Sequence, residues 1–218
     1  MKLEKYENLH ETFPVVLFLT LAGGFQDAYS YHMRGNVFAN AQTGNIVLLF
    51  KNIVDFNLSE MIKYLVPLFA FVLGVYIASR YEDYHKLNKL KWRQIILIFE
   101  IIFMIVVSFV PSSHNNIANA ILSFVCAMQV YSFKKIYGLN FATTMCIGNL
   151  RSATENLAKY HITNDDKYLS ASKKYYAVIL IFGIGAGFGY YFSNIFGLNS
   201  ILIAALSLCV ALFIMFFG

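Results

Sequence analysis

Polar residues with the chemistry of a binding site stand inside an otherwise apolar stretch, residues 23–50, with the sequence GGFQDAYSYHMRGNVFANAQTGNIVLLF. They supply one carboxylate, three amides and one hydroxyl, from Gln26, Asp27, Gln42, Thr43 and Asn45. A carboxylate only accepts hydrogen bonds when ionised, whereas amide and hydroxyl groups both donate and accept them. The pattern therefore predicts a site that binds a small polar solute, with these five residues as its lining.

Asp27 is the residue most expected to act through its charge. It lies about 20 Å along the helix predicted from Phe13, at a rise of 1.5 Å per residue, and so well inside a membrane. A charge at that depth costs at least about 3 kcal/mol unless it is paired or hydrated, and ionisable residues there are functional by default. We predict that Asp27 binds substrate or couples transport to an ion. The alternative is a structural ion pair with Arg34 or Arg151.

A weaker copy of this stretch occurs about half the chain length later, in residues 126–158. Gln129 matches Gln26, and Gly148-Asn149 matches Gly44-Asn45. Such a repetition indicates an internal duplication. It adds Gln129 and Asn149 to the predicted lining, although both amides could instead bridge helices or satisfy their own backbone.

At these residues the sequence resembles the YoaK/DUF1275 family of bacterial integral membrane proteins. The resemblance is carried by Gly24-x-x-Asp27-Ala28, by Phe38 followed by Thr43-Gly44-Asn45, and by Gly148-Asn149-Leu150-Arg151. It implies a small multi-pass protein of the bacterial cytoplasmic (inner) membrane, and little about its chemistry. Ile147 replaces the threonine in the second copy of the Gly-Asn motif.

The composition is that of a membrane protein. The 218 residues are 58% hydrophobic and 13% charged, whereas about a quarter of a soluble protein is charged. We expect a single membrane domain over residues 1–218. The net charge of +5 lies in predicted loops, which fits topology signals and not nucleic-acid binding. The three cysteines have no metal-ligand spacing, so no cofactor is expected.

The expected fold is an all-α polytopic membrane protein with six transmembrane helices, at residues 13–31, 61–79, 94–110, 117–133, 175–192 and 198–217. Each is near the length that a bilayer core requires. Residues 37–50 and 139–157 carry the Gly-Asn motifs and are predicted to be re-entrant or broken helices. The first is too short to span, and Asn149, Arg151 and Glu155 interrupt the second.

Charge placement predicts the orientation of these helices. Residues 80–93 and 161–174 carry clustered Lys and Arg and are expected to be cytoplasmic together with both termini. Residues 111–116 and 193–199 carry no formal charge and are expected to be external. Three crossings in each half then give an inverted repeat, with repeat 1 at about residues 13–110 and repeat 2 at about 117–217. Eight full spans are the alternative, but they would leave four lysines outside.

Glycines predict where helices bend and where they touch. The adjacent pair Gly23-Gly24 favours a break or kink in the first helix, because each glycine costs about 1 kcal/mol relative to alanine. The small-residue faces Gly183-x-x-x-Gly187 and Gly185-x-x-x-Gly189 predict close helix packing within the monomer or between protomers.

The favoured function is a small secondary transporter or permease for a small polar solute, which protons could drive. Asp27 and Glu100, which lies within an apolar run, are the candidate coupling residues. We expect no enzyme activity, because the sequence has no phosphate loop, nucleophile elbow or zinc motif. A membrane-embedded enzyme and a non-transporting structural or sensory protein are the alternatives. The expected partners are the solute, membrane lipid and a second copy of the chain, but no nucleic acid.

Overall fold

The computed structural model describes residues 12–84, 89–136, 139–140, 143–144 and 146–217. The chain is helical apart from one antiparallel pair of two-residue strands, β1 (Lys135–Ile136) and β2 (Leu139–Asn140). Its helices are α2 (Phe13–Met33), α3 (Gln42–Val54), α4 (Leu58–Tyr84), α5 (Lys89–Phe109), η2 (Ser112–His114), α6 (Asn115–Ser132), α7 (Cys146–Thr163), α8 (Asp166–Phe196), η3 (Gly197–Ser200) and α9 (Ile201–Phe217). The predicted helical fold class is confirmed.

Three helical stretches among the described residues are long and apolar enough to cross a membrane: Leu58–Asp83, Trp92–Phe109 and Asp166–Phe217. The last contains both α8 and α9, which meet at Gly197 with a positive φ of 56°. The chain is therefore a membrane protein. Helices α2 and α6 are not among these stretches, and each carries polar side chains that are buried inside the protein, among them Gln26 and Gln129.

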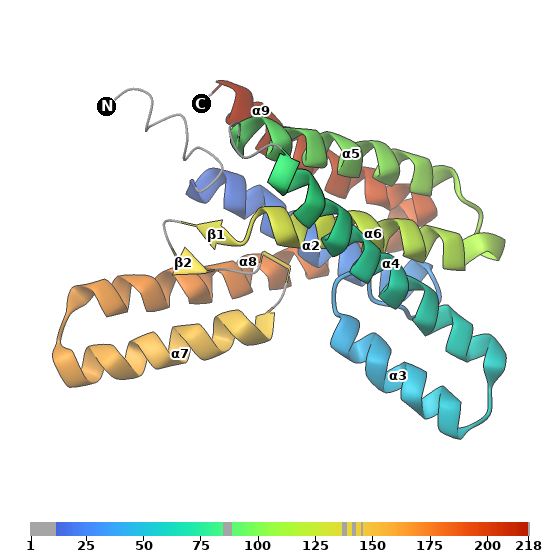
Figure 1. Cartoon of the computed structure of the whole chain (residues 1–218), viewed down its shortest axis with the longest axis horizontal. Helices are drawn as coiled ribbons and strands as arrows, with labels where there is room; N and C mark the ends of the chain where they lie inside the picture. Colours follow the sequence, from blue (N-terminus) through green and yellow to red (C-terminus); the bar gives the residue numbers. More distant parts are fainter. Residues whose placement is uncertain (1–11, 85–88, 137–138, 141–142, 145, 218) are drawn as a thin grey trace.

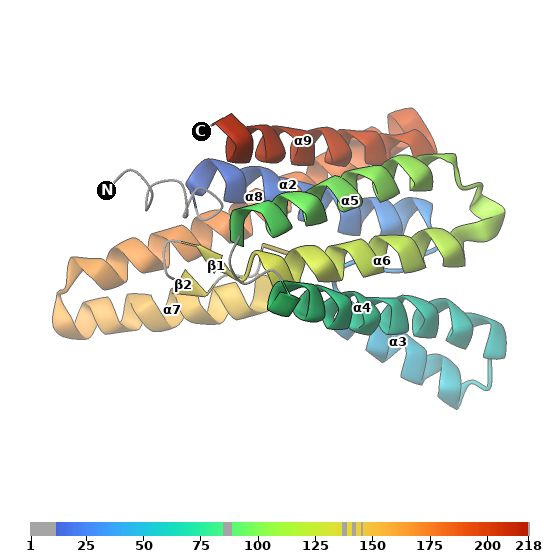
Figure 2. The same cartoon turned by 45° about the horizontal axis from the view of Figure 1, so that its top comes forward.

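The two helices that carry the Gly-Asn motifs, α3 and α7, run in opposite directions from the middle of the molecule. Figure 2 shows α3 extending toward one end of the bundle and α7 toward the other, and Figure 1 shows the same from another side. At 1.5 Å per residue, the 13 residues of α3 cover about 20 Å, too little to cross a hydrocarbon core of about 30 Å. Helix α7 has 18 residues but carries Arg151, Glu155 and Lys159. Each of the two helices is followed by a long one, α4 or α8.

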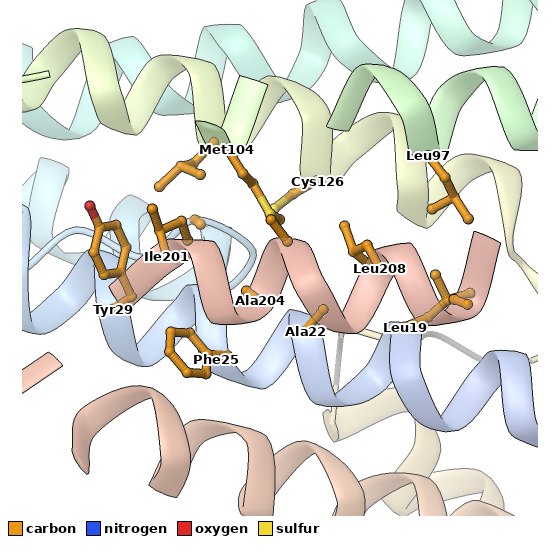
Figure 3. Packing of buried hydrophobic residues seen from close by; sticks show 14 of the residues in the cluster. Leu19, Ala22, Phe25, Tyr29, Leu97, Met104, Cys126, Ile201, Ala204 and Leu208 are labelled. Carbon is orange, nitrogen blue, oxygen red and sulfur yellow. The ribbon is translucent and has the colours of Figure 1, made fainter. Parts of the chain in front are cut away.

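The first helix of each half of the sequence packs on the last two long helices of the other half. Helix α2 packs against α8 and α9, whereas α6 packs against α4 and α5, and α5 meets α9 between them. The main core fills the space where α2, α5, α6 and α9 meet. Figure 3 shows Leu19 and Tyr29 of α2 there with Met104 of α5, Cys126 of α6 and Leu208 of α9, all fully buried.

The predicted break at Gly23-Gly24 is wrong, because α2 is one continuous helix from Phe13 to Met33. The glycines serve close packing instead. A Cβ at Gly24 would lie 2.1 Å from the carbonyl oxygen of Phe182 in α8, and one at Gly23 would lie 2.8 Å from Cγ2 of Thr144. Only a residue without a side chain lets these backbones approach so closely.

Helix α8 uses one of its two glycine faces for this contact. A Cβ at Gly185 would lie 2.3 Å from Leu21 O, and one at Gly189 would lie 2.6 Å from Phe25 O. Gly183 and Gly187 have nothing within 4 Å of their Cβ positions, and both are exposed. The predicted packing role therefore belongs to Gly185 and Gly189 within the monomer.

The predicted interruption of the second Gly-Asn segment is also wrong. Helix α7 continues without a break from Cys146 to Thr163. Arg151 and Glu155 do not break it because they form an ion pair of 2.7 Å along its exposed surface, one turn apart. The non-helical part of this segment lies before α7, as it does before α3.

We predict that Gly185→Leu destabilises the protein and that Gly187→Leu does not. The leucine at position 185 meets backbone atoms of α2, which cannot move aside as a flexible side chain can, so we expect a loss of about 3 kcal/mol or more. Leucine at position 187 meets open space. The measurement is the yield of monodisperse protein and its unfolding temperature in detergent. Equal behaviour of the two variants would contradict the assignment of the packing face.

Candidate functional site

The loops that precede α3 and α7 reach the same part of α2, near its middle. Asn40 Nδ2 donates to Gly23 O at 3.1 Å, and Asn40 N donates to Asp27 Oδ1 at 2.6 Å. On the other side, Thr144 contacts Gly23, where a Cβ would lie 2.8 Å from Thr144 Cγ2. Both segments therefore meet α2 at Gly23, in the middle of the bundle.

Asp27 is buried and carries no described basic partner. Its carboxyl group accepts the backbone N–H of Asn40, next to the start of α3. Neither arginine proposed as its partner reaches it. Arg34 donates to the carbonyls of Val107 at 2.7 Å and Val110 at 2.8 Å, at the end of α5, and Arg151 pairs with Glu155.

Asn45 holds the loop before α3 in shape. Its Oδ1 accepts the N–H of Phe38 at 3.0 Å, and its Nδ2 donates to Phe38 O at 2.8 Å and to Gln42 Oε1 at 2.9 Å. These bonds satisfy backbone groups that have no helical partner. The amide of Asn45 is thus fully used inside the protein, and its predicted contact with a solute stays a prediction.

A cavity of about 640 Å³ lies between α2, α8 and the starts of α3 and α7. Asp27, Asn40, Gln42 and Thr43 line it from the first half of the sequence, and Thr144, Cys146 and Ile147 line it from the second half. Three of the predicted site residues, Asp27, Gln42 and Thr43, therefore share one cavity. The other described lining residues are apolar or aromatic except Asn36.

The cavity extends along α2 from Asp27 toward the end of that helix. Tyr31 and His32 line this part, and His32 Nε2 hydrogen-bonds to Asn194 Oδ1 near the end of α8 at 3.0 Å. In the opposite direction, a separate buried cluster packs the start of α2 against the middle of α7 and the first half of α8; its members are Val16, Ala153, Tyr175 and Val178. The cavity therefore lies nearer to the end of the bundle where α2 ends.

Gln26, Glu100 and Gln129 lie in the core and not among the described residues that line the cavity. Gln26 Nε2 donates to Glu100 Oε1 at 2.9 Å, and the thiol of Cys126 contacts Gln26 Oε1. Glu100 Oε2 and Gln129 Oε1 are buried without a partner among the described residues. A carboxyl group held by a neutral amide at this depth costs much free energy when it is ionised.

Asn149 is buried in the first turn of α7. Asn149 comes three residues after Cys146, which lines the cavity, just as Asn45 comes three residues after Gln42. The structure thus gives the two motif asparagines corresponding places in their helices.

Sequence reasoning missed Asn40 and Thr144. Thr144 stands at the same distance before Gly148 that Asn40 has before Gly44, so an alignment of the two halves on their Gly-Asn pairs superimposes them. Both are buried and line the cavity, and Asn40 Oδ1 and Thr144 Oγ1 have no partner among the described residues. The matched spacing was the signal that could have found them.

The fold and the cavity define a helical integral membrane protein. Its cavity has polar side chains where α3 and α7 begin. The chain belongs to the DUF1275 family, whose model is described as a protein of unknown function and matches residues 15–215. The family suspected from the motifs is thereby confirmed. None of the curated proteins and none of the solved structures compared with the chain matches it.

We predict that Asn45→Ala lowers the stability of the protein by about 1–3 kcal/mol, because it leaves buried backbone groups of Phe38 unsatisfied. The matched control is Asn156→Ala, which removes a half-buried amide that bonds only to Ser152 O in its own helix. The control should change stability by about 0.5 kcal/mol or less. Thermal unfolding in detergent measures both variants. A smaller loss of stability at Asn45 than at Asn156 would contradict the role of Asn45 in holding the loop before α3.

Proposed function

We propose that this protein is a small secondary transporter or permease of the bacterial inner membrane and carries a small solute with a polar group. One observation carries the proposal. Corresponding positions of the two Gly-Asn segments, Asn40 with Thr144, Gln42 with Cys146 and Thr43 with Ile147, line a single cavity. In many transporters, substrate sites lie near the bilayer midplane where interrupted helices from two repeats meet.

An inverted repeat of three spans in each half accounts for the arrangement. The six spans are α2, α4 and α5 in the first half and α6, α8 and α9 in the second. Support comes from the packing, in which α2 meets α8 and α9 while α6 meets α4 and α5. Further support comes from α3 and α7, which leave the middle in opposite directions (Figure 2). Such exchange of partners is expected when two similar halves are related by a two-fold axis in the membrane plane.

The orientation follows from the charged ends of the bundle. The start of α2, the end of α9 and the turn between α7 and α8 lie toward one end, which Figures 1 and 2 show on the left. The last part of α7 carries Lys159, and the first part of α8 carries Lys167, Lys173 and Lys174. By the positive-inside bias this end is cytoplasmic, which places both termini in the cytoplasm.

In this orientation the described cavity lies nearer to the outside, and the Val16 cluster closes the path to the cytoplasm. A transporter has to open that cluster while it closes the outer end near His32 and Tyr190, which contact each other with ring centroids 4.7 Å apart. The α7–α8 hairpin forms part of both ends. Movement of this hairpin relative to α2 therefore serves as the access change in the proposed mechanism.

The roles of the site residues follow from their positions. Asp27, Gln42 and Thr43 contact the solute, whereas Asn45 and Asn149 shape the two helix starts. Glu100 serves as a proton site in the core, where its Oε1 accepts a hydrogen bond from Gln26 of α2. Gln129 adds a buried acceptor, Oε1, that has no partner among the described residues. Proton binding at Glu100 would couple transport to the proton gradient.

We predict that a cysteine introduced by Asp166→Cys reacts only from the cytoplasm, and one introduced by Ser112→Cys only from outside. Both positions are exposed in the turns at opposite ends of the bundle. The measurement uses a membrane-impermeant maleimide on intact and permeabilised cells, in a background without Cys126, Cys146 and Cys209. Labelling of position 166 in intact cells would contradict the six-span topology and the inverted repeat.

We predict that a cysteine placed by Thr43→Cys can be reached from both sides of the membrane, because the cavity has to open alternately. Impermeant maleimide should label it in intact cells and in inverted vesicles. Thr20→Cys is the control, since Thr20 is fully buried in α2 and does not belong to the described cavity lining. If Thr43→Cys reacts from one face only, in every condition tested, the protein does not alternate access.

A further inference from the structure

We propose that the cavity beside Asp27 recognises an amphipathic organic amine, with an ammonium group at the polar end and an apolar or aromatic body in the rest of the cavity. This inference rests on the proposed function for its biological meaning, but it concerns binding alone. It narrows the small polar solute to one chemical class.

The first argument is the charge of the lining. Asp27 is the one Asp, Glu, Lys or Arg among the described residues that line the cavity. No described Lys or Arg side chain forms an ion pair with it, although it is buried at membrane depth. An ionised carboxylate there needs a counter-charge. A bound ammonium supplies it, and the ion pair remains only while the solute is present.

The second argument is the hydrogen-bonding capacity of Asp27. An ionised carboxylate has two oxygens with about four acceptor positions, and Oδ1 receives the N–H of Asn40. The positions that remain can accept hydrogen bonds from a solute. An ammonium group carries three donors, whereas a carboxylate solute carries none.

The third argument concerns the opposing effect of the helix starts. The starts of α3 and α7 each direct about half a positive charge toward the cavity, which by itself would favour an anion. At α3, however, Asp27 already accepts the amide of Asn40 in the preceding loop. The one full negative charge of Asp27 offsets the two half charges of the helix starts, so these helix starts do not turn the cavity into an anion site.

The fourth argument is the shape and chemistry of the remaining wall. A volume of about 640 Å³ is far larger than a bare metal ion needs, and no group of three or more His, Cys, Asp or Glu side chains among the described residues could hold a metal. Aromatic rings of Tyr31, Phe38, Phe182 and Tyr190 line the space. Tyr31 and Phe38 stack with centroids 4.6 Å apart. Aromatic faces attract ammonium groups and pack against apolar bodies.

The test compares four probes on purified protein in detergent: 2-phenylethylammonium, 2-phenylethanol, 3-phenylpropionate and methylammonium. The first three share a phenyl body and differ in the polar end, and the fourth keeps the ammonium without the body. We expect 2-phenylethylammonium to bind at least tenfold more tightly than each of the others, measured by equilibrium dialysis. Tighter binding of 3-phenylpropionate would overturn the proposal, as would the absence of any binding by 2-phenylethylammonium.

Two variants link the binding to the site. Asp27→Asn should weaken 2-phenylethylammonium at least tenfold and leave 2-phenylethanol within about threefold. Because Asp27 also supports the loop before α3, Tyr31→Leu provides a second variant, which removes an aromatic face from the cavity wall. Tyr31→Leu should weaken the ammonium at least threefold, and the matched control Tyr191→Leu, another exposed tyrosine that is not among the described lining residues, should not. Unchanged binding in Tyr31→Leu, or equal loss in Tyr191→Leu, would contradict the proposed site.

The outcomes separate this inference from the proposed function. Amine binding at the site together with one-sided labelling of Thr43→Cys would show a receptor for amines that does not transport them. Two-sided labelling without amine binding would show alternating access for another class of solute, and would overturn the inference alone.

Discussion

The structure depends on how it satisfies backbone N–H and C=O groups where two loops enter the interior of a membrane protein. Lipid offers no hydrogen bonds, so every such group has to be satisfied within the protein. The loop before α3 obtains its partners from α2 and from its own helix: Asp27 accepts Asn40 N, Ser30 Oγ accepts Ala39 N, and Asn45 binds both polar groups of Phe38. These contacts fix where α3 begins, and thus where the cavity is.

Close backbone contact is the second constraint, and it follows from the first. A loop can reach the polar groups of α2 only if the neighbouring helices leave room, and Gly23 provides it where Thr144 approaches. Gly24, Gly185 and Gly189 let α8 lie directly on α2, so the cavity is bounded by two helices in backbone contact. The corresponding contact in the other half is Gly74 of α4, where a Cβ would lie 2.3 Å from Phe124 O in α6.

Hydropathy and charge predicted the membrane class, and the two Gly-Asn motifs predicted the family and the importance of residues 37–50 and 139–157. These signals are local, and a repeated motif is readable without a structure. What the sequence could not provide is the direction of side chains on helices that are buried all round. Gln26 and Asp27 are adjacent in α2, yet Gln26 faces Glu100 in the core whereas Asp27 lines the cavity. The role of Gly24 was misjudged for the same reason, because a kink and a close contact require the same residue.

The glycine contact between α2 and α8 also has a mechanical meaning. Gly185 lies well inside α8, whose first residue, Asp166, is about 28 Å away at 1.5 Å per residue. With Gly24 against Phe182, Leu21 against Gly185 and Phe25 against Gly189, the closest backbone contact between α8 and α2 covers about two turns of α8. Helix α8 extends much farther from this contact toward Asp166 than toward its other end. A tilt of about 10° about Gly185 moves the tip at Asp166 by about 5 Å, as the helix rise implies. Because α7 is joined to this longer arm, small adjustments of packing beside the cavity become large displacements at the turn between α7 and α8.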